Sequence, residues 1–169
     1  IVVDDGSADT THDKVQQAAA ADGRVVAVRY DLNRGKGHAL RYGFGFAGGE
    51  LVAFLDADLD IHPRQLLSFL SIMKDSAADV VIGSKLHPLS RLAYPWHRRV
   101  ISKVYFILVR ILFGLPVLDT QTGLKLFQRN VLAQTLPDLT VEGFAFDLEL
   151  LVLAHQLGYK IVDAPVILT

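Results

Sequence analysis

Residues 51–60 read Leu-Val-Ala-Phe-Leu-Asp-Ala-Asp-Leu-Asp, five apolar residues followed by aspartates at alternate positions. A short apolar run that ends at a turn predicts a buried strand. The carboxylates of Asp56, Asp58 and Asp60 would then leave the end of that strand together. Because ligands of open α/β sheets bind at the carboxyl ends of strands, this stretch indicates both the fold class and the candidate site.

The rest of the chain alternates short apolar runs with helical segments. Further strands are predicted at 1–3, 25–28, 80–82 and 160–168, and helices at 9–21, 36–47, 63–75 and 144–157. Strands that alternate with helices imply parallel β-α-β units. Pro165 in the last predicted strand favours an edge position, because proline cannot donate to the sheet ladder. The predicted fold class is α/β, a mostly parallel central sheet with helices on both faces, in a single domain over 1–169.

The composition excludes several classes of protein. A length of 169 residues fits one domain with a real core. The formal net charge of −1 argues against nucleic acid as a partner. The chain has no cysteine, so disulfides and thiolate metal sites are excluded.

Two stretches of the chain bear on whether a strand is missing and on whether a helix spans a membrane. The chain opens on the β-branched run Ile1–Val3, and we expect a fragment whose first strand has been lost. Residues 104–118 are the most apolar, but Arg110, Gly114 and Pro116 interrupt them. A spanning helix needs about 18 uninterrupted apolar residues, so none is predicted there.

The aspartates of residues 56–60 predict a metal site. Two carboxylates ~4 Å apart repel by about 4 kcal/mol at an effective dielectric constant of 20, which a cation or a proton must relieve. Oxygen ligands beside a phosphate suit Mg²⁺ or Mn²⁺. The alternative is helix capping, because Asp60 lies shortly before the helix predicted to begin at Pro63.

Further loops are expected at the same edge of the sheet. Asp4-Asp5-Gly6-Ser7 follows the first strand, and Gly83-Ser84-Lys85 follows the fourth. A carboxylate in the first loop suits a ribose hydroxyl or a base N–H, although a turn with a helix cap also explains these residue types. Gly35-Lys36-Gly37 would let a cation approach a diphosphate, but its spacing is not that of a Walker loop.

Six motifs occur in an order that resembles the GT-A inverting glycosyltransferases of family 2, specifically the polyprenyl-phosphate (dolichyl-phosphate) mannosyl- and glucosyltransferases. They are Val3–Ser7, Asn33-x-Gly35-Lys36-Gly37, Asp56-Ala57-Asp58, Gly83–Lys85, Asp119–Phe127 and Phe146–Leu151. The resemblance implies a GT-A fold and transfer of a hexose from GDP-mannose or UDP-glucose to a polyprenyl phosphate, with Mg²⁺ or Mn²⁺. It also implies the cytoplasmic face of a membrane as the location.

The resemblance implies roles for matching residues only. Asp60 stands where relatives often have Gln, and Lys85 stands where arginine is more usual, which loses the bidentate fork for phosphate. Arg98 or Arg99, with Ser102, resembles an Arg-x-x-x-Ser element that meets the acceptor phosphate. The implied metal ligands are Asp56, Asp58 and Asp60, the donor-binding residues Asp4, Asp5, Lys36, Asp56 and Gln121, and the catalytic residues Asp58, Lys85, Arg99 and Asp147.

A phosphate acceptor changes what the active site has to supply. A phosphomonoester with a second pKa of about 6 is largely dianionic at pH 7, so it needs no general base. The site must instead hold cations against the nucleophile and the leaving diphosphate. By resemblance Asp147 is a candidate base or sugar ligand; an acidic residue at a helix N-terminus is an equally good explanation.

Residues 86–118 are interpreted as an acceptor- and membrane-proximal insertion. Basic side chains there interleave with aromatic and aliphatic ones, as in an interfacial helix. A core helix with a solvated basic face is the alternative.

Other functions remain open on the sequence. A haloacid-dehalogenase-like phosphatase also carries an Asp-x-Asp after an apolar strand, but Leu59-Asp60 and the later motifs fit it poorly. A degenerate module that binds a sugar nucleotide without turnover, and transfer to a saccharide acceptor, are the remaining alternatives.

Overall fold

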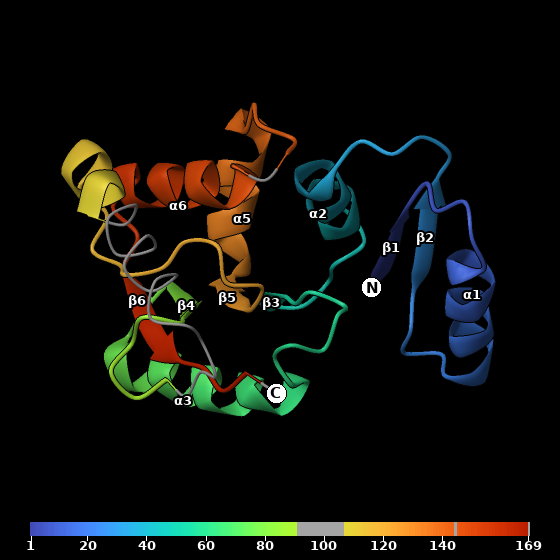
Figure 1. Ribbon diagram of the computed structural model, residues 1–169, viewed down its shortest axis with the longest axis horizontal. Coiled ribbons are helices and arrows are strands. Elements are labelled where there is room, and N and C mark those ends of the chain that lie inside the picture. The colour runs from blue at the N-terminus through green and yellow to red at the C-terminus, as the bar shows by residue number, and fades with distance from the viewer. Residues whose placement is uncertain (91–106, 144, 169) are drawn as a thin grey trace. The chain divides into compact units, whose positions relative to one another are not determined.

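The computed structural model describes residues 1–90, 107–143 and 145–168, which form two compact units. The first unit comprises Ile1–Gly49 and Asp138–Glu149, and the second comprises Glu50–Pro137 and Leu150–Thr169. Each unit has its own sheet, and Figure 1 shows the elements that belong to each. The predicted Arg99 and most of its basic segment lie outside the described residues.

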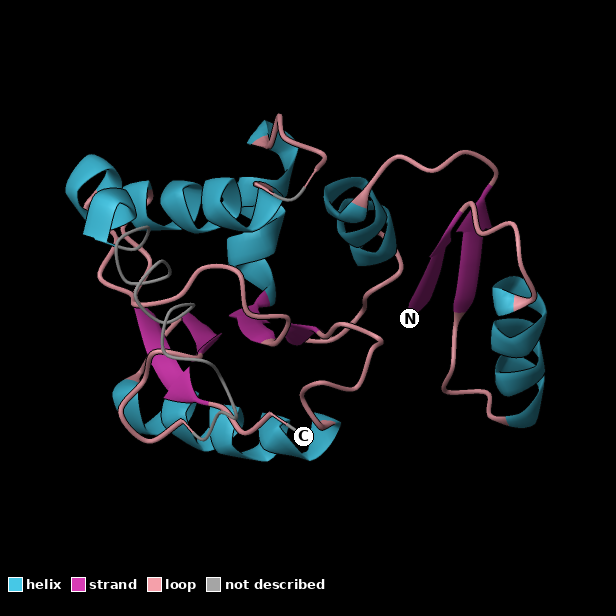
Figure 2. Ribbon diagram, in the orientation of Figure 1, coloured by secondary structure: helices cyan, strands magenta, loops and turns pink. Residues whose placement is uncertain are grey.

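The first unit is a parallel strand pair with helices packed against it. Its elements are β1 (Val2–Asp5), α1 (Thr11–Ala21), β2 (Ala27–Tyr30) and α2 (Lys36–Phe44). Helix α1 connects the two parallel strands and contacts both, while α2 contacts β1 (Figure 2). A Cβ at Gly43 would come within 2.8 Å of Val3 Cγ2, so the glycine permits the close approach of α2 to β1.

The second unit is built on a four-stranded sheet in the order β3-β5-β4-β6. Strand β5 is antiparallel to β3 and β4, and β6 is parallel to β4, so three of the four strands share one direction. The elements that lie wholly in this unit are β3 (Leu51–Phe54), η1 (Pro63–Gln65), α3 (Leu66–Ser76), β4 (Val80–Ser84), β5 (Lys125–Gln128), α5 (Arg129–Thr135) and β6 (Ile161–Pro165). Two further elements, η2 (Leu136–Asp138) and α6 (Phe146–Gln156), have residues in both units.

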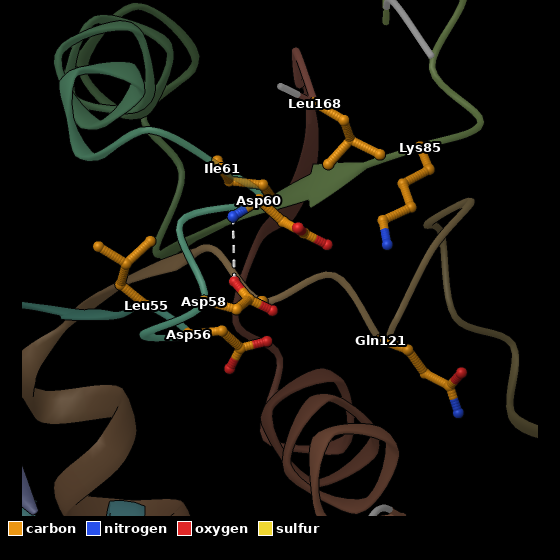
Figure 3. A pocket seen from close by; sticks show the side chains of 9 residues that line it. Leu55, Asp56, Asp58, Asp60, Ile61, Lys85, Gln121 and Leu168 are labelled. Atoms are coloured by element: carbon orange, nitrogen blue, oxygen red, sulfur yellow. Dashed lines mark hydrogen bonds between the residues drawn. The ribbon is translucent and has the colours of Figure 1, made fainter. Parts of the chain in front are cut away.

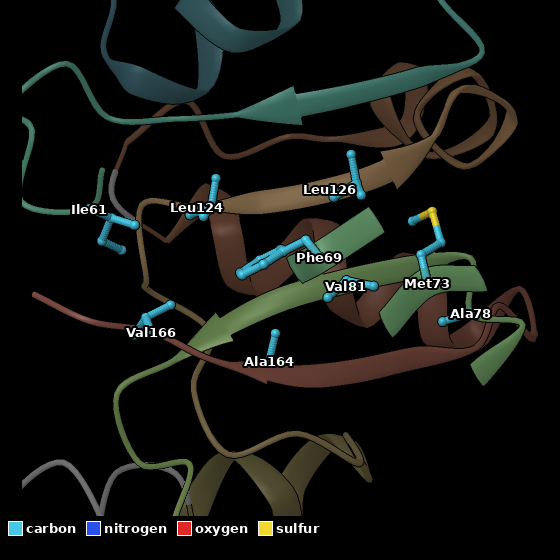
Figure 4. Packing of buried hydrophobic residues seen from close by; sticks show 9 residues of the cluster. All are labelled: Ile61, Phe69, Met73, Ala78, Val81, Leu124, Leu126, Ala164 and Val166. Atoms are coloured by element: carbon cyan, nitrogen blue, oxygen red, sulfur yellow. The ribbon is translucent and has the colours of Figure 1, made fainter. Parts of the chain in front are cut away.

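Apolar side chains cover both faces of this sheet. Phe69 and Met73 of α3 pack on one face against Val81, Leu126 and neighbouring buried residues (Figure 4). Figure 1 shows α5 and α6 on the opposite side of the sheet from α3. Because neighbouring residues of a strand point to opposite faces, the residues on either side of Val81 face those helices.

The observed elements follow the predicted alternation, with one local difference in strand direction. The predicted α/β class with helices on both faces is confirmed, and β6 lies at the sheet edge, as Pro165 predicted. Helix α6 ends in a Schellman motif, in which Gly158 (φ +83°) and Tyr159 donate to the carbonyls of His155 and Ala154. Strand β5 was not predicted, and it runs antiparallel to both of its neighbours, β3 and β4.

Candidate active site

The loops that carry the aspartates of residues 56–60 and Lys85 meet at one edge of the second unit's sheet. Strands β3 and β4 point in the same direction, and each is antiparallel to β5 between them. The ends of β3 and β4 therefore lie beside the start of β5. This geometry brings together the loop after β3, the residue after β4 and the turn that precedes β5.

A pocket opens where these segments meet. The space between its walls is about 350 Å³ including the solvent-open mouth. The lining combines acidic, basic, amide and apolar residues: Leu55, Asp56, Asp58, Asp60, Ile61, Lys85, Gln121, Gly123 and Leu168. Figure 3 shows the three aspartates along one wall and the Lys85 and Gln121 side chains across from them. The structure thus brings together five residues predicted for the site.

The loop after β3 turns through a left-handed residue. Leu59 has φ +64°, a conformation that costs a non-glycine residue roughly 1 kcal/mol or more. Within this turn, Asp58 Oδ1 accepts a hydrogen bond from the Asp60 N–H at 3.1 Å. The turn therefore directs alternate aspartates to one pocket wall. A leucine held in this conformation is typical of a functional loop, where local strain concentrates.

Asp56 is fixed by its contact with Gly123. The Asp56 N–H donates to the Gly123 carbonyl at 3.2 Å, which ties the end of β3 to the turn before β5. A Cβ at position 123 would lie 2.2 Å from Asp56 Oδ2 and 2.5 Å from its Cγ. Only glycine leaves room there for the carboxylate.

Asp119 stabilises the turn before β5, a role that was not predicted from the sequence. Its buried carboxylate accepts hydrogen bonds from the Lys85 N–H (3.0 Å), the Gln121 N–H (3.0 Å) and the Thr122 hydroxyl (2.7 Å). The ammonium of Lys125, also buried, donates to the Thr122 carbonyl at 2.6 Å. Only the contact with the Gln121 N–H has a local signal, because an aspartate often accepts from the backbone two residues later.

The donor set fits a hard divalent cation with phosphate as a co-ligand. Carboxylate oxygens line the pocket, and Lys85 adds one positive charge suited to phosphate. Across the described residues, no group of three or more His, Asp or Glu side chains converges closely enough to enclose a metal by itself. An Mg²⁺ site commonly uses one or two carboxylates with substrate phosphates and water, so an open arrangement is compatible with that ion.

Asp4 and Asp5 belong to the first unit, where both bind backbone N–H groups. Asp4 is buried and accepts from the Ser7 N–H at 2.9 Å; hydrogen bonding from Ser7 holds the pKa of its carboxyl below the ordinary value. Asp5 accepts from the N–H groups of Arg34 (2.7 Å) and Gly35 (2.9 Å). Burial opposes ionisation of Asp5, yet hydrogen bonds led by that from Arg34 lower its pKa. Asp4 therefore orders its own turn, whereas Asp5 joins that turn to the residues that precede α2.

The other predicted residues of the first unit form an ion pair. Lys36 Nζ lies 3.6 Å from Asp147 Oδ2, and Asp147 is only 5% exposed. Lys36 opens α2, whereas Asp147 lies in the first turn of α6. The pair gives the lysine a fixed position and gives the buried carboxylate a cation.

Glu149, the second acid of the same motif, holds a loop. Its carboxylate oxygens accept from the Thr140 N–H, the Thr140 hydroxyl (2.7 Å) and the Val141 N–H (2.8 Å). Burial opposes its ionisation, but these hydrogen bonds bring its pKa below the ordinary value. Both carboxylate oxygens of Glu149 therefore serve a structural role.

The described part of the 86–118 segment exposes apolar surface. Residues 107–113 are helical and carry a single charge, Arg110. Five of them are between 43% and 75% exposed: Ile107, Leu108, Ile111, Leu112 and Phe113. Throughout the residues that the structure describes, no helix has the length and apolarity to cross a bilayer.

An α/β sheet with a pocket of carboxylates and a lysine at its strand ends defines a protein suited to bind a metal and a phosphorylated ligand. The chain belongs to glycosyl transferase family 2, whose sequence profile matches residues 1–136. This confirms the family that the six motifs predicted.

Among its relatives are two enzymes named for lipid phosphates. The polyprenol monophosphomannose synthase of Mycolicibacterium smegmatis is 31% identical over 175 residues, which cover 100% of this chain and 66% of that protein. The dolichyl-phosphate beta-glucosyltransferase of Saccharomyces cerevisiae is 31% identical over 187 residues, covering 98% of this chain and 55% of that protein. The chain spans between 27% and 66% of the length of the first curated relatives it matches.

Solved structures confirm the fold. The crystal structure of Mycobacterium tuberculosis glucosyl-3-phosphoglycerate synthase has a TM-score of 0.71 and 22% identity, and the match covers 100% of this chain and 60% of that one. A crystal structure of the same synthase with Mn²⁺, uridine diphosphate and glucosyl-3-phosphoglycerate has a TM-score of 0.69 and 21% identity, covering 99% and 58%.

Proposed function

We propose that this chain is the catalytic region of a metal-dependent inverting hexosyltransferase. The donor is a nucleotide-diphosphate sugar, GDP-mannose or UDP-glucose, and the acceptor is a polyprenyl (dolichyl or undecaprenyl) phosphate. The observation that carries the proposal is the pocket in which Asp56, Asp58 and Asp60 face Lys85. Membership of glycosyl transferase family 2 and the names of the two relatives at 31% identity support the choice of reaction.

The proposed site divides between metal and phosphate contacts. Asp56 and Asp58 would hold Mg²⁺ or Mn²⁺, with Asp60 as the third oxygen ligand. When bound, the ion would neutralise charge that develops on the leaving nucleoside diphosphate. Lys85 places its ammonium across the pocket from the aspartates, where it favours a phosphate. Gln121, which also lines the pocket, is proposed to contact the donor.

The chemical step follows from the acceptor. A phosphate oxygen of the polyprenyl phosphate forms a bond to the anomeric carbon while the bond from that carbon to the diphosphate oxygen breaks. The electron pair leaves with the nucleoside diphosphate, and the anomeric configuration inverts. The acceptor phosphate is already ionised at pH 7, so no residue has to remove a proton. Asp147 would bind a sugar hydroxyl, and Arg99 would contact the acceptor phosphate.

The nucleoside of the donor is assigned to the loops of the first unit. Asp4 and Asp5 are proposed to contact it, and Lys36 is proposed as a further donor-binding residue. The hydrogen bonds of Asp5 to Arg34 and Gly35 support a fixed loop in which few carboxylate lone pairs remain for a ribose. Contact with the nucleoside therefore requires Asp5 to accept a further hydrogen bond without releasing the loop.

A membrane surface is the proposed setting of the reaction. The exposed apolar residues of 107–113 would lie against lipid on the cytoplasmic face, close to where a polyprenyl phosphate presents its head group. Flotation with anionic vesicles tests this part. Replacing Ile111 and Leu112 by serine should reduce vesicle binding while leaving the unfolding midpoint nearly unchanged; equal binding by the variant would contradict it.

A donor screen tests the function as a whole. The full-length protein is incubated with radiolabelled UDP-glucose or GDP-mannose, a short polyprenyl phosphate, and Mn²⁺ or Mg²⁺. We expect label to enter the lipid extract with one donor, and chelation to abolish the transfer. Label on a saccharide would overturn the acceptor, nucleotide binding without transfer would favour a non-catalytic module, and phosphate release from simple monoesters would favour a phosphatase.

A further inference from the structure

Asp119 connects separate pieces of the pocket without lining it. Its carboxylate is 4% exposed and accepts from the N–H of Lys85, 34 residues earlier in the chain, and from the N–H of Gln121. Lys85 and Gln121 both line the pocket, whereas Asp119 does not. The contact joins the end of β4 to the turn before β5 through one side chain.

The two carboxylate oxygens of Asp119 accept hydrogen bonds from different donors. Oδ2 accepts from the Lys85 N–H at 3.0 Å and from the Thr122 hydroxyl at 2.7 Å, whereas Oδ1 accepts from the Gln121 N–H at 3.0 Å. All of these donors point to one acidic group, so the turn is defined relative to β4 by charge-assisted hydrogen bonds. An amide in place of the acid can satisfy one side only.

The surroundings leave this turn little freedom to relax. A Cβ at Gly83 would come within 2.8 Å of Thr122 Cγ2, which shows how closely the turn packs on β4. Lys125 Nζ holds the Thr122 carbonyl from the other side. A neighbouring carboxyl, Asp163, accepts from the Leu118 N–H at 3.0 Å; burial, together with the charge of Asp119, raises its pKa to about 6.

We propose that Asp119 is a positioning residue, which fixes the backbone of Lys85 and of Gln121 and so determines where their side chains stand relative to the aspartates of residues 56–60. The inference rests on the proposed function, since it assigns those two side chains to the phosphates of the reaction. Misplacement of a reacting group by about 1 Å costs up to roughly a hundredfold in rate, so a side chain outside the pocket controls turnover.

The first test is a double-mutant cycle between Asp119→Asn and Gln121→Ala. The asparagine oxygen can take the place of Oδ2, which leaves its NH₂ facing the Gln121 N–H. We expect D119N to lower kcat/KM of the full-length protein by roughly tenfold or more. In the Gln121→Ala background the same change should cost less than about threefold, because the side chain it misplaces is gone. Equal costs in both backgrounds would overturn the proposal for Gln121.

The Lys85 contact needs a second cycle. Asp119→Ala removes both oxygens, so its loss beyond that of D119N reports on the Lys85 side. That additional loss should nearly disappear in a Lys85→Ala background. If it persists unchanged, Asp119 does not act through Lys85.

Asp79→Asn is the matched control. Asp79 lies just before Val80, at the opposite end of β4 from Lys85. Its Oδ2 accepts a hydrogen bond from the Lys160 N–H at 2.8 Å, so Asp79 also joins a loop to this strand. D79N should shift the unfolding midpoint but leave kcat/KM within about twofold of wild type. An equal loss of kcat/KM in D79N and D119N would reduce Asp119 to a merely stabilising residue.

Amide hydrogen exchange separates failure of this inference from failure of the proposed function. D119N should speed exchange of the Gln121 N–H without affecting that of Lys160. If wild type transfers no hexose, the proposed function fails, and unchanged exchange at Gln121 overturns the positioning role independently. With an active wild type, additive cycles overturn this inference alone.

Discussion

The Asp56 carboxylate fills the space that a side chain at Gly123 would need. A Cβ there would lie 2.2 Å from Asp56 Oδ2, while the Asp56 N–H donates to the Gly123 carbonyl at 3.2 Å. The end of β3 and the turn before β5 are therefore matched to each other. In the proposed enzyme this match fixes the direction of a metal-binding carboxylate.

Replacing Gly123 by alanine should damage the site more than the fold. The methyl group displaces Asp56, so we expect Mn²⁺-dependent nucleotide affinity to fall by at least about tenfold, with a stability loss of about 1–3 kcal/mol from overpacking. Calorimetric titration and urea unfolding measure the two effects. Gly48→Ala is the control, because a Cβ there meets nothing within 4 Å. Unchanged affinity in Gly123→Ala would show that Asp56 has no role in binding.

The three aspartates should differ in how well they tolerate substitution. The resemblance implies that glutamine can take the place of Asp60, so Asp60→Gln should keep kcat/KM within about fivefold of wild type. Asp58→Asn removes the negative charge but keeps the shape of the side chain. This substitution should lower kcat/KM by roughly a hundredfold or more, as the removal of an electrostatic group from an active site does. Radiolabel transfer at saturating Mn²⁺ provides the measurement. Equal losses in the two variants would contradict separate roles.

Removing the Asp147 carboxylate tests whether a general base is needed. Asp147→Asn breaks the charge pair with Lys36 and should lower kcat. The acid limb of the pH profile should nevertheless stay near pH 6, because ionisation of the acceptor phosphate determines it. If the limb disappears in the variant, Asp147 is the base.

The pH dependence of stability should carry a contribution from Asp163. Its pKa is raised from 3.8 to about 6 by burial and by the nearby Asp119 charge. The folded state therefore holds a proton that the unfolded state releases between pH 4 and 6, and stability falls as pH rises through that interval. Asp163→Asn should be more stable than wild type at pH 7.5 by about 1–2 kcal/mol, after allowing for partial exposure. Urea unfolding should show this advantage shrinking toward pH 4; an advantage independent of pH would contradict it.

Local patterns in the sequence predicted most of the fold. Apolar runs located the strands, Pro165 indicated the edge strand, and Gly158 marked the end of α6. Strand β5 was missed because it is short and begins with a charged residue, Lys125, where a buried strand is expected to be apolar. That lysine is buried, with its amine bound to the Thr122 carbonyl, and only tertiary contacts make such burial acceptable.

The residues that line the candidate site were predicted from the sequence, but the contacts that hold them in place were not. Asp56, Asp58, Asp60, Lys85 and Gln121 were expected at the site, and they line one pocket. The role of Asp119 depends on a hydrogen bond to Lys85, 34 residues away, which no local pattern encodes. The left-handed conformation of Leu59 was equally hidden, because leucine rarely adopts it.

The most direct test of the central claim is nucleotide binding with and without a divalent ion. Uridine diphosphate and guanosine diphosphate are titrated into the full-length protein by calorimetry, with Mn²⁺ or with chelator, for wild type and Asp56→Asn. We expect one of the nucleotides to bind wild type only when Mn²⁺ is present. The Asp56→Asn variant should bind that nucleotide weakly whether or not Mn²⁺ is present. Binding of equal strength with chelator, or in the variant, would contradict a metal-assisted diphosphate site at these aspartates.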